Sequence, residues 1–378
     1  MKQMMIRPEI QSYGTFQAFA EEYALDENDV ILTNEYIYHP IMAKEHLKCH
    51  VIYQEKYGAG EPTDSMAEAI LREVKKYRAR RIIAVGGGTI IDIAKVLVPE
   101  GAEGIDEMYD KMASLKKGKQ LIILPTTCGT GSEVTNIAVL NRTKLGTKQG
   151  MVSPAMFADR AVLIPEFLKG LSYKVFATSS IDALVHAVES YLNPAATVFS
   201  MMYSVRAIEM ILAGYCRIAK EGQEAWKKDA EAYLTASCMA GIAFSNNGCG
   251  TVHAMAYAIG GKYHVPHGES NYQYFVPVLR LYEEKAPGGR LEELKVLLKR
   301  CMAAGGFAAE EDDKSAVVLL GELLNQVLPA KKMREYGVVQ EDIAPFAQST
   351  VDYQQRLLKN SYIPLGKEEI QAVYQSCL

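Results

Sequence analysis

Asp182 and His186 lie four residues apart in the segment SSIDALVHAVESY (179–191). On an α-helix this spacing places both side chains on one face, one turn apart, so that a carboxylate and an imidazole can converge on a single ion. The pair could therefore supply two ligands of a metal site. The alternative is structural: Asp182 would favour the helix dipole from the first turn, and His186 would be a partly buried histidine with ordinary hydrogen bonds.

A second segment rich in histidine, GTVHAMAYAIGGKYHVPHGESN (250–271), could supply the remaining ligands. On one unbroken helix, His253 and His267 would lie about 21 Å apart, too far to bind one ion. We therefore expect the helix to break at the glycines of positions 260–261, with Pro266 directing His267 back towards His253. Scattered structural histidines are not expected to produce this pattern of helix, break and return.

Two glycine-bearing loops follow predicted strands and could hold a phosphate-containing ligand. Three glycines at 86–88 separate the run RIIAV from a helical stretch, so the backbone can turn sharply and a helix N-terminus can face a phosphate. This loop matches neither GxGxxG nor the Walker A pattern, and the alternative is a tight turn without a ligand. A second loop, TTCGTGS (126–132), follows the run LIILP. Two such loops at the carboxyl ends of neighbouring strands predict a dinucleotide site.

Asn34 follows the first predicted strand, a position from which an acidic or amide side chain can reach the adenosine ribose of a dinucleotide. Because this side chain is neutral, it does not exclude a 2′-phosphate by charge repulsion. We expect NAD as the cofactor, and NADP remains the open alternative.

The elements that would position these residues fall into two groups. Short apolar runs at 29–34, 50–54, 81–85 and 121–125 predict buried parallel strands that alternate with helices, one of which is entered through Thr63. After Pro165 the strands stop and helical periodicity with charged outer faces takes over. The helical segments are 200–218, 224–244, 291–304, 314–327, 342–358 and 367–377.

This order of elements predicts two domains, which is also the natural number for 378 residues. We predict an α/β, Rossmann-like dinucleotide-binding domain over 1–168 and an all-helical (all-α) metal-binding domain over 169–378.

Composition favours a small-molecule substrate in a reducing compartment. The net charge is −4, from 41 basic and 45 acidic residues interspersed along the chain, which gives no basic footprint for nucleic acid or an anionic membrane. No apolar stretch is long enough for a signal peptide or a membrane helix. The seven cysteines never form a CxxC pair, which argues against cysteine-bound zinc and iron–sulfur clusters and for free thiols. We expect a cytoplasmic protein.

Four motifs in order, GGGTIIDIAK, PTTCGTGSE, SIDALVHAVESY and VHAMAYAIGGKYHVPHGE, resemble the iron-containing (group III) alcohol dehydrogenase family over nearly the whole chain. The resemblance implies a dehydroquinate synthase-like architecture, NAD, a divalent iron ion and a homo-oligomer, for which we expect a dimer. It implies metal ligands at Asp182, His186, His253 and His267. It implies cofactor contacts at Asn34, Gly86, Gly87, Gly88, Thr89, Thr126, Thr127, Thr130 and Lys148.

Further similarity suggests a substrate. The stretches TNEYIY (33–38), QEKYGAGEPTD (54–64) and YHVPHGESNYQYF (263–275) are similar to family members that interconvert 4-hydroxybutyrate and succinate semialdehyde. Other small alcohols, such as 1,3-propanediol or butanol, are the near alternative. More distant alternatives are a metal-dependent lyase resembling dehydroquinate synthase and a non-catalytic nucleotide-binding protein. A carboxylate-bearing substrate needs a cationic partner, for which the candidates are Arg142, Lys148 and Lys262.

One position departs from the pattern of the family. Many members carry a second histidine four residues after His253, and here that residue is Tyr257. A tyrosine can relay a proton, but its ordinary pKa is near 10, so the relay could instead fall to His264 or to water. The alternative for both side chains is simple packing near the site. Tyr257, His264 and His267 are therefore the catalytic candidates.

The ligand set bears on the choice of metal. Four protein ligands fill a tetrahedral zinc ion, whereas a catalytic zinc usually keeps one position open. Iron(II) takes five or six ligands and leaves room for a substrate, and a zinc ion that expands its coordination is the alternative. We expect the metal to act as a Lewis acid towards the substrate oxygen while a hydride passes to the nicotinamide.

Overall fold

The computed structural model describes residues 3–145, 147–309 and 312–378. The chain divides into two compact units. The first is Ile6–Leu171, and the second consists of Ser172–Leu378 with residues 3–5. The first contains a parallel sheet and the second is helical, which confirms the predicted fold class.

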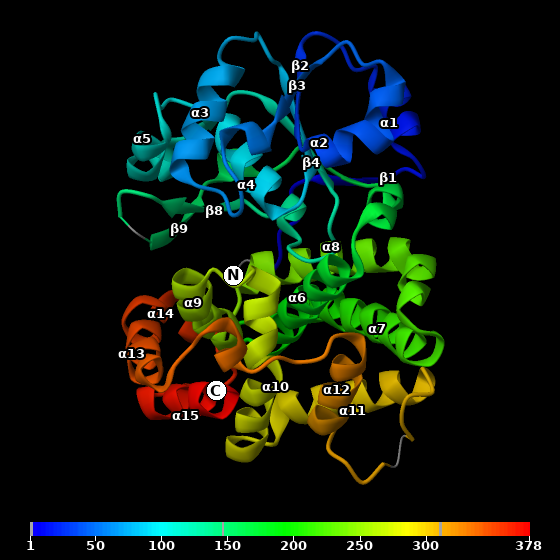
Figure 1. Ribbon diagram of the computed structural model, residues 1–378, viewed down its shortest axis with the longest axis vertical. Helices are drawn as coiled ribbons and strands as arrows, with labels where there is room; N and C mark the ends of the chain where they lie inside the picture. Colours follow the sequence, from blue (N-terminus) through cyan, green and yellow to red (C-terminus); the bar gives the residue numbers. More distant parts are fainter. Residues whose placement is uncertain (1–2, 146, 310–311) are drawn as a thin grey trace. The chain divides into compact units, whose positions relative to one another are not determined.

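The first unit is organised around a six-stranded parallel sheet (Figure 1). Four of its strands are those that the apolar runs predict, and two strands of four residues each, neighbours at one side of the sheet, were not predicted. In spatial order the strands are β1 (Glu9–Ser12), β10 (Arg160–Leu163), β7 (Gln120–Pro125), β4 (Arg81–Gly86), β2 (Asp29–Thr33) and β3 (His50–Tyr53).

Side chains of these strands alternate between the two faces of the sheet, and both faces are covered. On one face, Ile82 and Ala84 pack in a core cluster that includes residues of α3 (Asp64–Val74) and α4 (Gly88–Leu97). On the other face, Ile83 joins the phenylalanines of α1 (Phe16–Tyr23). Burial on both faces explains why the strands read as continuous apolar runs.

The remaining elements of the first unit are short. They are α2 (Glu35–Ile37), α5 (Ile105–Asp110), the two-stranded pair β5 (Pro99–Glu100) and β6 (Lys116–Lys117), and the antiparallel hairpin β8 (Ile137–Arg142) and β9 (Thr147–Val152).

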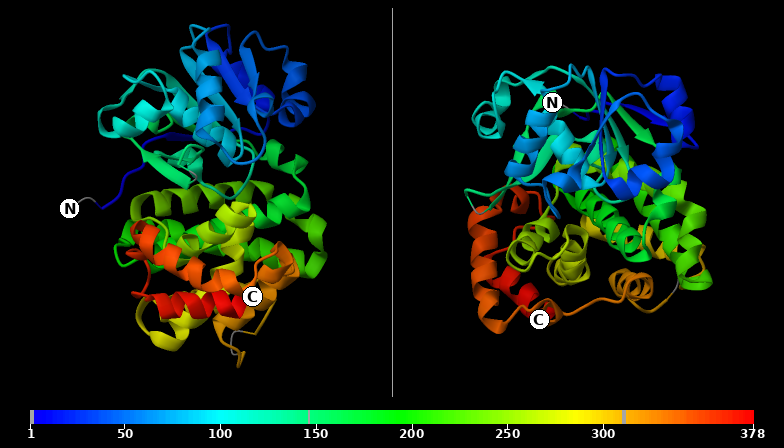
Figure 2. Two further views of the ribbon diagram at one scale, coloured as in Figure 1. Left: turned by 60° about the vertical axis from the view of Figure 1, so that its left-hand side comes forward. Right: turned by 45° about the horizontal axis from the view of Figure 1, so that its top comes forward.

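The second unit is built from helices packed on one another (Figure 2), and its described residues form no strand. Each predicted helical segment corresponds to a helix or to two consecutive helical pieces. The helices are α6 (Tyr173–Leu192), α7 (Val198–Glu221), α8 (Ala230–Asn247), α9 (Thr251–Tyr263), α10 (His267–Lys285), α11 (Gly289–Ala304), α12 (Ala316–Val327), α13 (Ile343–Tyr353), α14 (Gln355–Leu358) and α15 (Lys367–Cys377).

Helix α6 lies at the centre of this unit. It packs against α7, α8 and α10, and every residue from Ser180 to Leu192 is buried. A helix that is covered on all sides explains why the segment 179–191 carries so few charges. Polar side chains on such a helix need partners inside the unit.

The turn between α9 and α10 differs from the prediction. Helix α9 continues through the glycines at 260–261, so the expectation that they break it is wrong. The chain reverses at His264, which adopts a left-handed conformation with φ 54°, and at Pro266, after which α10 begins with His267. A residue before proline is biased towards extended backbone, which helps to end the helix at this point.

Among the described residues, no helix combines the length and the apolar composition needed to cross a membrane.

Lys95 connects α4 to the end of the second glycine-bearing loop and to the residues that follow it. Its ammonium group is fully buried and donates to the hydroxyls of Ser132 (2.6 Å) and Thr135 (2.8 Å) and to the Ile137 carbonyl (2.7 Å). Its ion-pair partner Asp92 lies 3.8 Å away. Burial lowers the pKa of Lys95 to about 8, although Asp92 acts in the opposite direction.

We predict that Lys95→Met destabilises the first unit by about 3 kcal/mol, because the partly buried Asp92 is left without its counter-charge. The deficit relative to the wild type should widen as the pH rises from about 8 towards 10.4, the ordinary lysine pKa. In that window the unfolded wild-type chain binds more protons than the folded one, so its stability rises with pH.

Thermal unfolding followed by circular dichroism measures the effect. The exposed Lys48→Met is the matched control and should change stability by less than about 0.5 kcal/mol. A melting temperature of Lys95→Met equal to that of the control would contradict the structural role of Lys95.

Candidate metal centre and dinucleotide loops

The structure brings all four predicted metal ligands together. Asp182, His186, His253 and His267 each offer one ligand atom, and these atoms lie within 4.8 Å of one another. The Nε2 atoms of His186 and His253 are 2.9 Å apart. Asp182 Oδ1 lies 3.9 Å from Nε2 of both His253 and His267. Three of the four residues are buried, while the His267 side chain is 43% exposed.

Three helices supply these side chains. Asp182 and His186 lie in the middle of α6, so Asp182 is not in a first turn and the structural alternative for it is wrong. Helix α9 carries His253, and α10 starts at His267. Next to His267, a Cβ atom on Gly268 would lie 2.5 Å from the Thr178 carbonyl oxygen, so only glycine lets the start of α10 approach α6 this closely.

The chemistry of this group fits a cation. Asn271 directs its amide nitrogen at Asp182 Oδ1 (2.7 Å), His253 Nε2 (3.1 Å) and His267 Nε2 (3.2 Å). The amide oxygen of Asn271 is buried and has no hydrogen-bond partner. Lone pairs thus converge on one donor, as they would on a metal ion. Three imidazoles and a carboxylate form a set that suits iron(II) or zinc.

Electrostatics keeps the carboxylate charged. Burial would raise the pKa of Asp182, but His186, His267 and His253 outweigh it and hold that pKa below its ordinary value. A deprotonated Asp182 is the form that binds a metal.

Glu189 is a functional residue that the sequence analysis missed. Its carboxylate accepts from His253 Nδ1 (2.6 Å) and from the backbone nitrogens of Gly250 (3.0 Å) and Val252 (2.6 Å). A proton held on Nδ1 leaves Nε2 of His253 free to face the ligand group. The available signal was the spacing of three residues between His186 and Glu189, which puts both on one helical face.

Cys249 lies with Glu189 and His253 in a second close group of possible ligands. Burial raises the pKa of the Cys249 thiol, and a protonated thiol is a poor metal ligand. Glu189 is also engaged by the start of α9 and by His253. The group of four is therefore the better candidate.

The two glycine-bearing loops pack against each other. Gly86 ends β4, and Gly87 and Gly88 start α4. A Cβ atom on Gly86 would lie 2.4 Å from Ile90 Cγ1, and one on Gly88 would lie 3.2 Å from Thr130 Cγ2. A Cβ atom on Gly87 would lie 3.4 Å from Thr127 Cγ2. The first turn of α4 and the loop after β7 thus form one continuous backbone surface.

Other predicted cofactor contacts lie around this surface. Thr89 Oγ1 donates to the carbonyl of Gly60 (3.3 Å), and the Lys148 ammonium lies 2.5 Å from the carboxylate of the neighbouring Glu61. The backbone nitrogen of Thr126 donates to the Gly86 carbonyl (3.1 Å). These residues are placed close to the loops, and their contact with a cofactor stays a prediction.

The two relay candidates occupy different positions. Tyr257 lies one helical turn after His253 and is half-buried in a small apolar cluster with Phe244, whose ring stacks on His186 at 4.3 Å. His264 is exposed at the end of α9 and is not one of the four grouped ligands. Tyr257 thus shares a cluster with a ring that contacts one of the ligands, and a relay role for either side chain stays a prediction.

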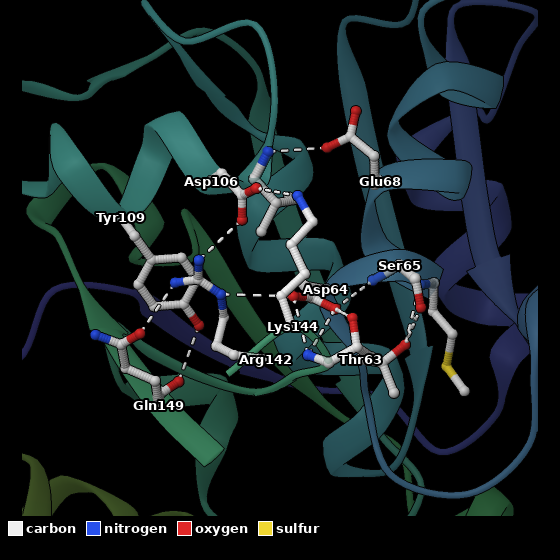
Figure 3. Close-up of polar contacts among 12 residues, drawn as sticks. Thr63, Asp64, Ser65, Glu68, Asp106, Tyr109, Arg142, Lys144 and Gln149 are labelled. Carbon is white, nitrogen blue, oxygen red and sulfur yellow. Dashed lines mark hydrogen bonds and ion pairs between the residues drawn. The ribbon is translucent and has the colours of Figure 1, made fainter. Parts of the chain in front are cut away.

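Arg142 is held inside the first unit (Figure 3). Its guanidinium donates to Asp106 (2.8 Å) and Gln149 (2.9 Å), lies 3.5 Å from Asp64, and covers the ring of Tyr109 at 4.0 Å. These contacts anchor the β8–β9 hairpin to α3 and α5. A guanidinium with two carboxylate partners is a poor candidate for binding a substrate carboxylate.

The other two cationic candidates are paired in the same way. Lys148 is paired with Glu61, and Lys262 with Asp342. All three cations suggested by the sequence therefore have carboxylate partners within the protein.

Comparison with known proteins identifies the family. Residues 15–165 match the model described as iron-containing alcohol dehydrogenase, and residues 176–378 match the C-terminal model of the Fe-containing alcohol dehydrogenase family. The chain belongs to the iron-containing alcohol dehydrogenase family.

One curated relative and two solved structures place the chain further. It is 42% identical over 375 residues to the 4-hydroxybutyrate dehydrogenase of Clostridium kluyveri, and the match covers 99% of both chains. The structure of a 1,3-propanediol oxidoreductase matches with a TM-score of 0.84 at 22% identity, covering 100% of both chains. The NAD+ complex of Bifidobacterium kashiwanohense sulfoacetaldehyde reductase matches with a TM-score of 0.83 at 19% identity, covering 100% of this chain and 98% of the other. These two structures support the fold.

We predict that Glu189→Gln weakens metal binding by about 10- to 100-fold, because an amide nitrogen would face one of the donors that the carboxylate accepts from. Titration of the metal-free protein with Fe(II) or Zn(II) measures the affinity. Glu322→Gln, which neutralises an exposed glutamate on α12, is the control and should bind metal like the wild type.

The melting temperature of the metal-free protein separates two roles of Glu189. If the residue only caps α9, this temperature falls while the metal affinity of the folded protein stays at the wild-type value. That outcome would contradict a role in orienting His253.

Proposed function

We propose that this protein is an NAD-dependent, metal-dependent 4-hydroxybutyrate dehydrogenase, with iron(II) as the metal and zinc as the alternative. The assignment of the substrate rests on the 42% identity to the Clostridium kluyveri 4-hydroxybutyrate dehydrogenase, which covers 99% of both chains. The convergence of Asp182, His186, His253 and His267 supports the metal dependence.

The proposed reaction oxidises the terminal CH–OH group of 4-hydroxybutyrate. The carbon gives a hydride to NAD+, the hydroxyl gives a proton to the protein or to water, and the products are succinate semialdehyde, NADH and a proton. The reverse direction consumes the same three species. A bound divalent metal supplies Lewis-acid polarisation of the substrate oxygen.

The residues of the chain have separate tasks in this proposal. Asp182 and the three histidines would hold the metal, Asn271 orients Asp182 through its amide, and Glu189 keeps the Nδ1 proton on His253. Tyr257 is the proposed proton relay.

The glycine-bearing loops would bind the dinucleotide through backbone groups. The N–H groups at the start of α4 are not used by the helix itself and can donate to a pyrophosphate. Close packing of Gly88 on Thr130 brings the threonines of the second loop to the same surface.

The protein's setting is also part of the proposal. None of the seven cysteines, all of which the structure describes, forms a disulfide, as expected for a protein in the reducing cytoplasm. A homodimer that binds no nucleic acid stays our expectation for its assembly.

We predict that kcat/KM for 4-hydroxybutyrate exceeds that for butanol and 1,3-propanediol by about tenfold or more, because a site built for a carboxylate rejects substrates that leave its polar groups unpaired. NADH formation with iron-loaded enzyme measures the rates. Metal-free enzyme is the control and should form no NADH. Equal kcat/KM values for the hydroxy acid and the uncharged alcohols would contradict the substrate assignment while leaving the dehydrogenase activity intact.

A further inference from the structure

Glu55 places an exposed carboxylate at the carboxyl edge of the parallel sheet. It is the second residue after β3, in the single-turn helix Gln54–Tyr57. Its two oxygens accept from the Asn34 side-chain amide (2.8 Å) and from the Glu35 backbone nitrogen (2.6 Å). Both donors are neutral, so the negative charge of Glu55 is retained at this edge.

The register of the sheet puts this carboxylate beside the glycine-bearing loop. Thr33 pairs with Tyr53, and Leu32 pairs with Ala84, so β2, β3 and β4 end at the same level. In doubly wound folds, the strand next to the glycine-loop strand ends with the side chain that meets the adenosine ribose. That neighbouring strand is β2, which is followed by Asn34.

Asn34 itself is turned towards Glu55 and Gln54. Its amide nitrogen donates to both side chains, at 2.8 Å and 3.2 Å. Asn34 is neutral and lies at the ribose position. Its hydrogen bond holds the carboxylate of Glu55, which follows the neighbouring strand β3, at that same position. Each oxygen of Glu55 keeps a lone pair that can accept a ribose hydroxyl.

The nearby lysine does not cancel this charge. Lys56 lies 3.3 Å from the carboxylate of Glu35 and 4.7 Å from the centre of the Tyr53 ring. Glu35 and Lys56 compensate each other, which leaves Glu55 as the uncompensated charge of the group.

We propose that Glu55 selects NAD over NADP. It accepts hydrogen bonds from the ribose of NAD, and it repels the doubly charged 2′-phosphate of NADP. This inference rests on the proposed dinucleotide site. Asn34, at the end of β2, is neutral and cannot distinguish the two cofactors by charge. The inference therefore assigns the choice of cofactor to Glu55, which follows β3.

Dissociation constants of NAD+ and NADP+ for the metal-loaded enzyme and its variants test the proposal. The wild type should bind NAD+ more tightly. Glu55→Gln should reduce the ratio of the NADP+ to the NAD+ constant by about tenfold or more, because the charge is removed. Glu55→Asp keeps the charge but shortens the side chain, so it should retain most of the wild-type preference. Glu103→Gln, which removes a fully exposed charge from the same unit, should leave the ratio unchanged.

The outcomes separate the possible failures. If Glu55→Gln and Glu55→Asp lose the preference for NAD+ equally, the geometry of the loop selects the cofactor. That result would overturn the role of the charge. An unchanged ratio in Glu55→Gln, with NAD+ still bound by the wild type, would overturn the role of Glu55 altogether. A wild-type protein that binds neither nucleotide would instead refute the dinucleotide site on which the inference rests. Melting temperatures confirm that each variant is folded.

Discussion

Two imidazole nitrogens 2.9 Å apart, with a buried carboxylate beside them, form an arrangement that needs a proton or a cation at its centre. Lone pairs that face one another in a low-dielectric interior repel unless a proton or a cation lies between them. The structure meets this constraint partly with the amide of Asn271. A divalent metal would meet it fully, and the family to which the chain belongs is described as iron-containing.

The architecture of the helical unit follows from holding these side chains in place. Asp182 and His186 must lie on a helix that is buried on all sides, and α6 is such a helix. His253 and His267 must come from two helices that meet α6 at one point. The left-handed turn at His264 reverses the chain, and Gly268 allows α10 to approach the backbone of α6 at Thr178. Glu189 then joins α6 to the start of α9 and fixes the ring of His253 between them.

Several features could be predicted from the sequence because each depends on local spacing. The sequence predicts one group of four ligands. Asp182 and His186 are four residues apart on a helix, and His253 and His267 lie on either side of a chain reversal. The structure brings all four together. Continuous apolar runs predict β2, β3, β4 and β7 because both faces of the sheet are covered. The capping threonine of α3, Thr63, has the expected side-chain bond to Met66 N (3.0 Å).

Other features could not be predicted because they depend on tertiary contacts. In the sequence, Glu189 and Asn271 look like ordinary polar residues. Their roles depend on contacts that only the fold creates, such as the contact that each makes with His253. The edge strand β1 and its neighbour β10 were missed, and β1 is the mostly exposed run EIQS, which lacks the continuous apolar character of the predicted strands. The position of the helix break was wrong because buried packing keeps Gly260 helical, while a non-glycine residue takes the left-handed conformation at His264.

The location of the metal tests the central claim most directly. Anomalous X-ray diffraction at the iron edge, from crystals of the protein purified with Fe(II), should show one peak within about 2.5 Å of Asp182, His186, His253 and His267. A peak bound instead by Cys249 and Glu189, or the absence of any peak among the four residues in iron-loaded crystals, would contradict the account.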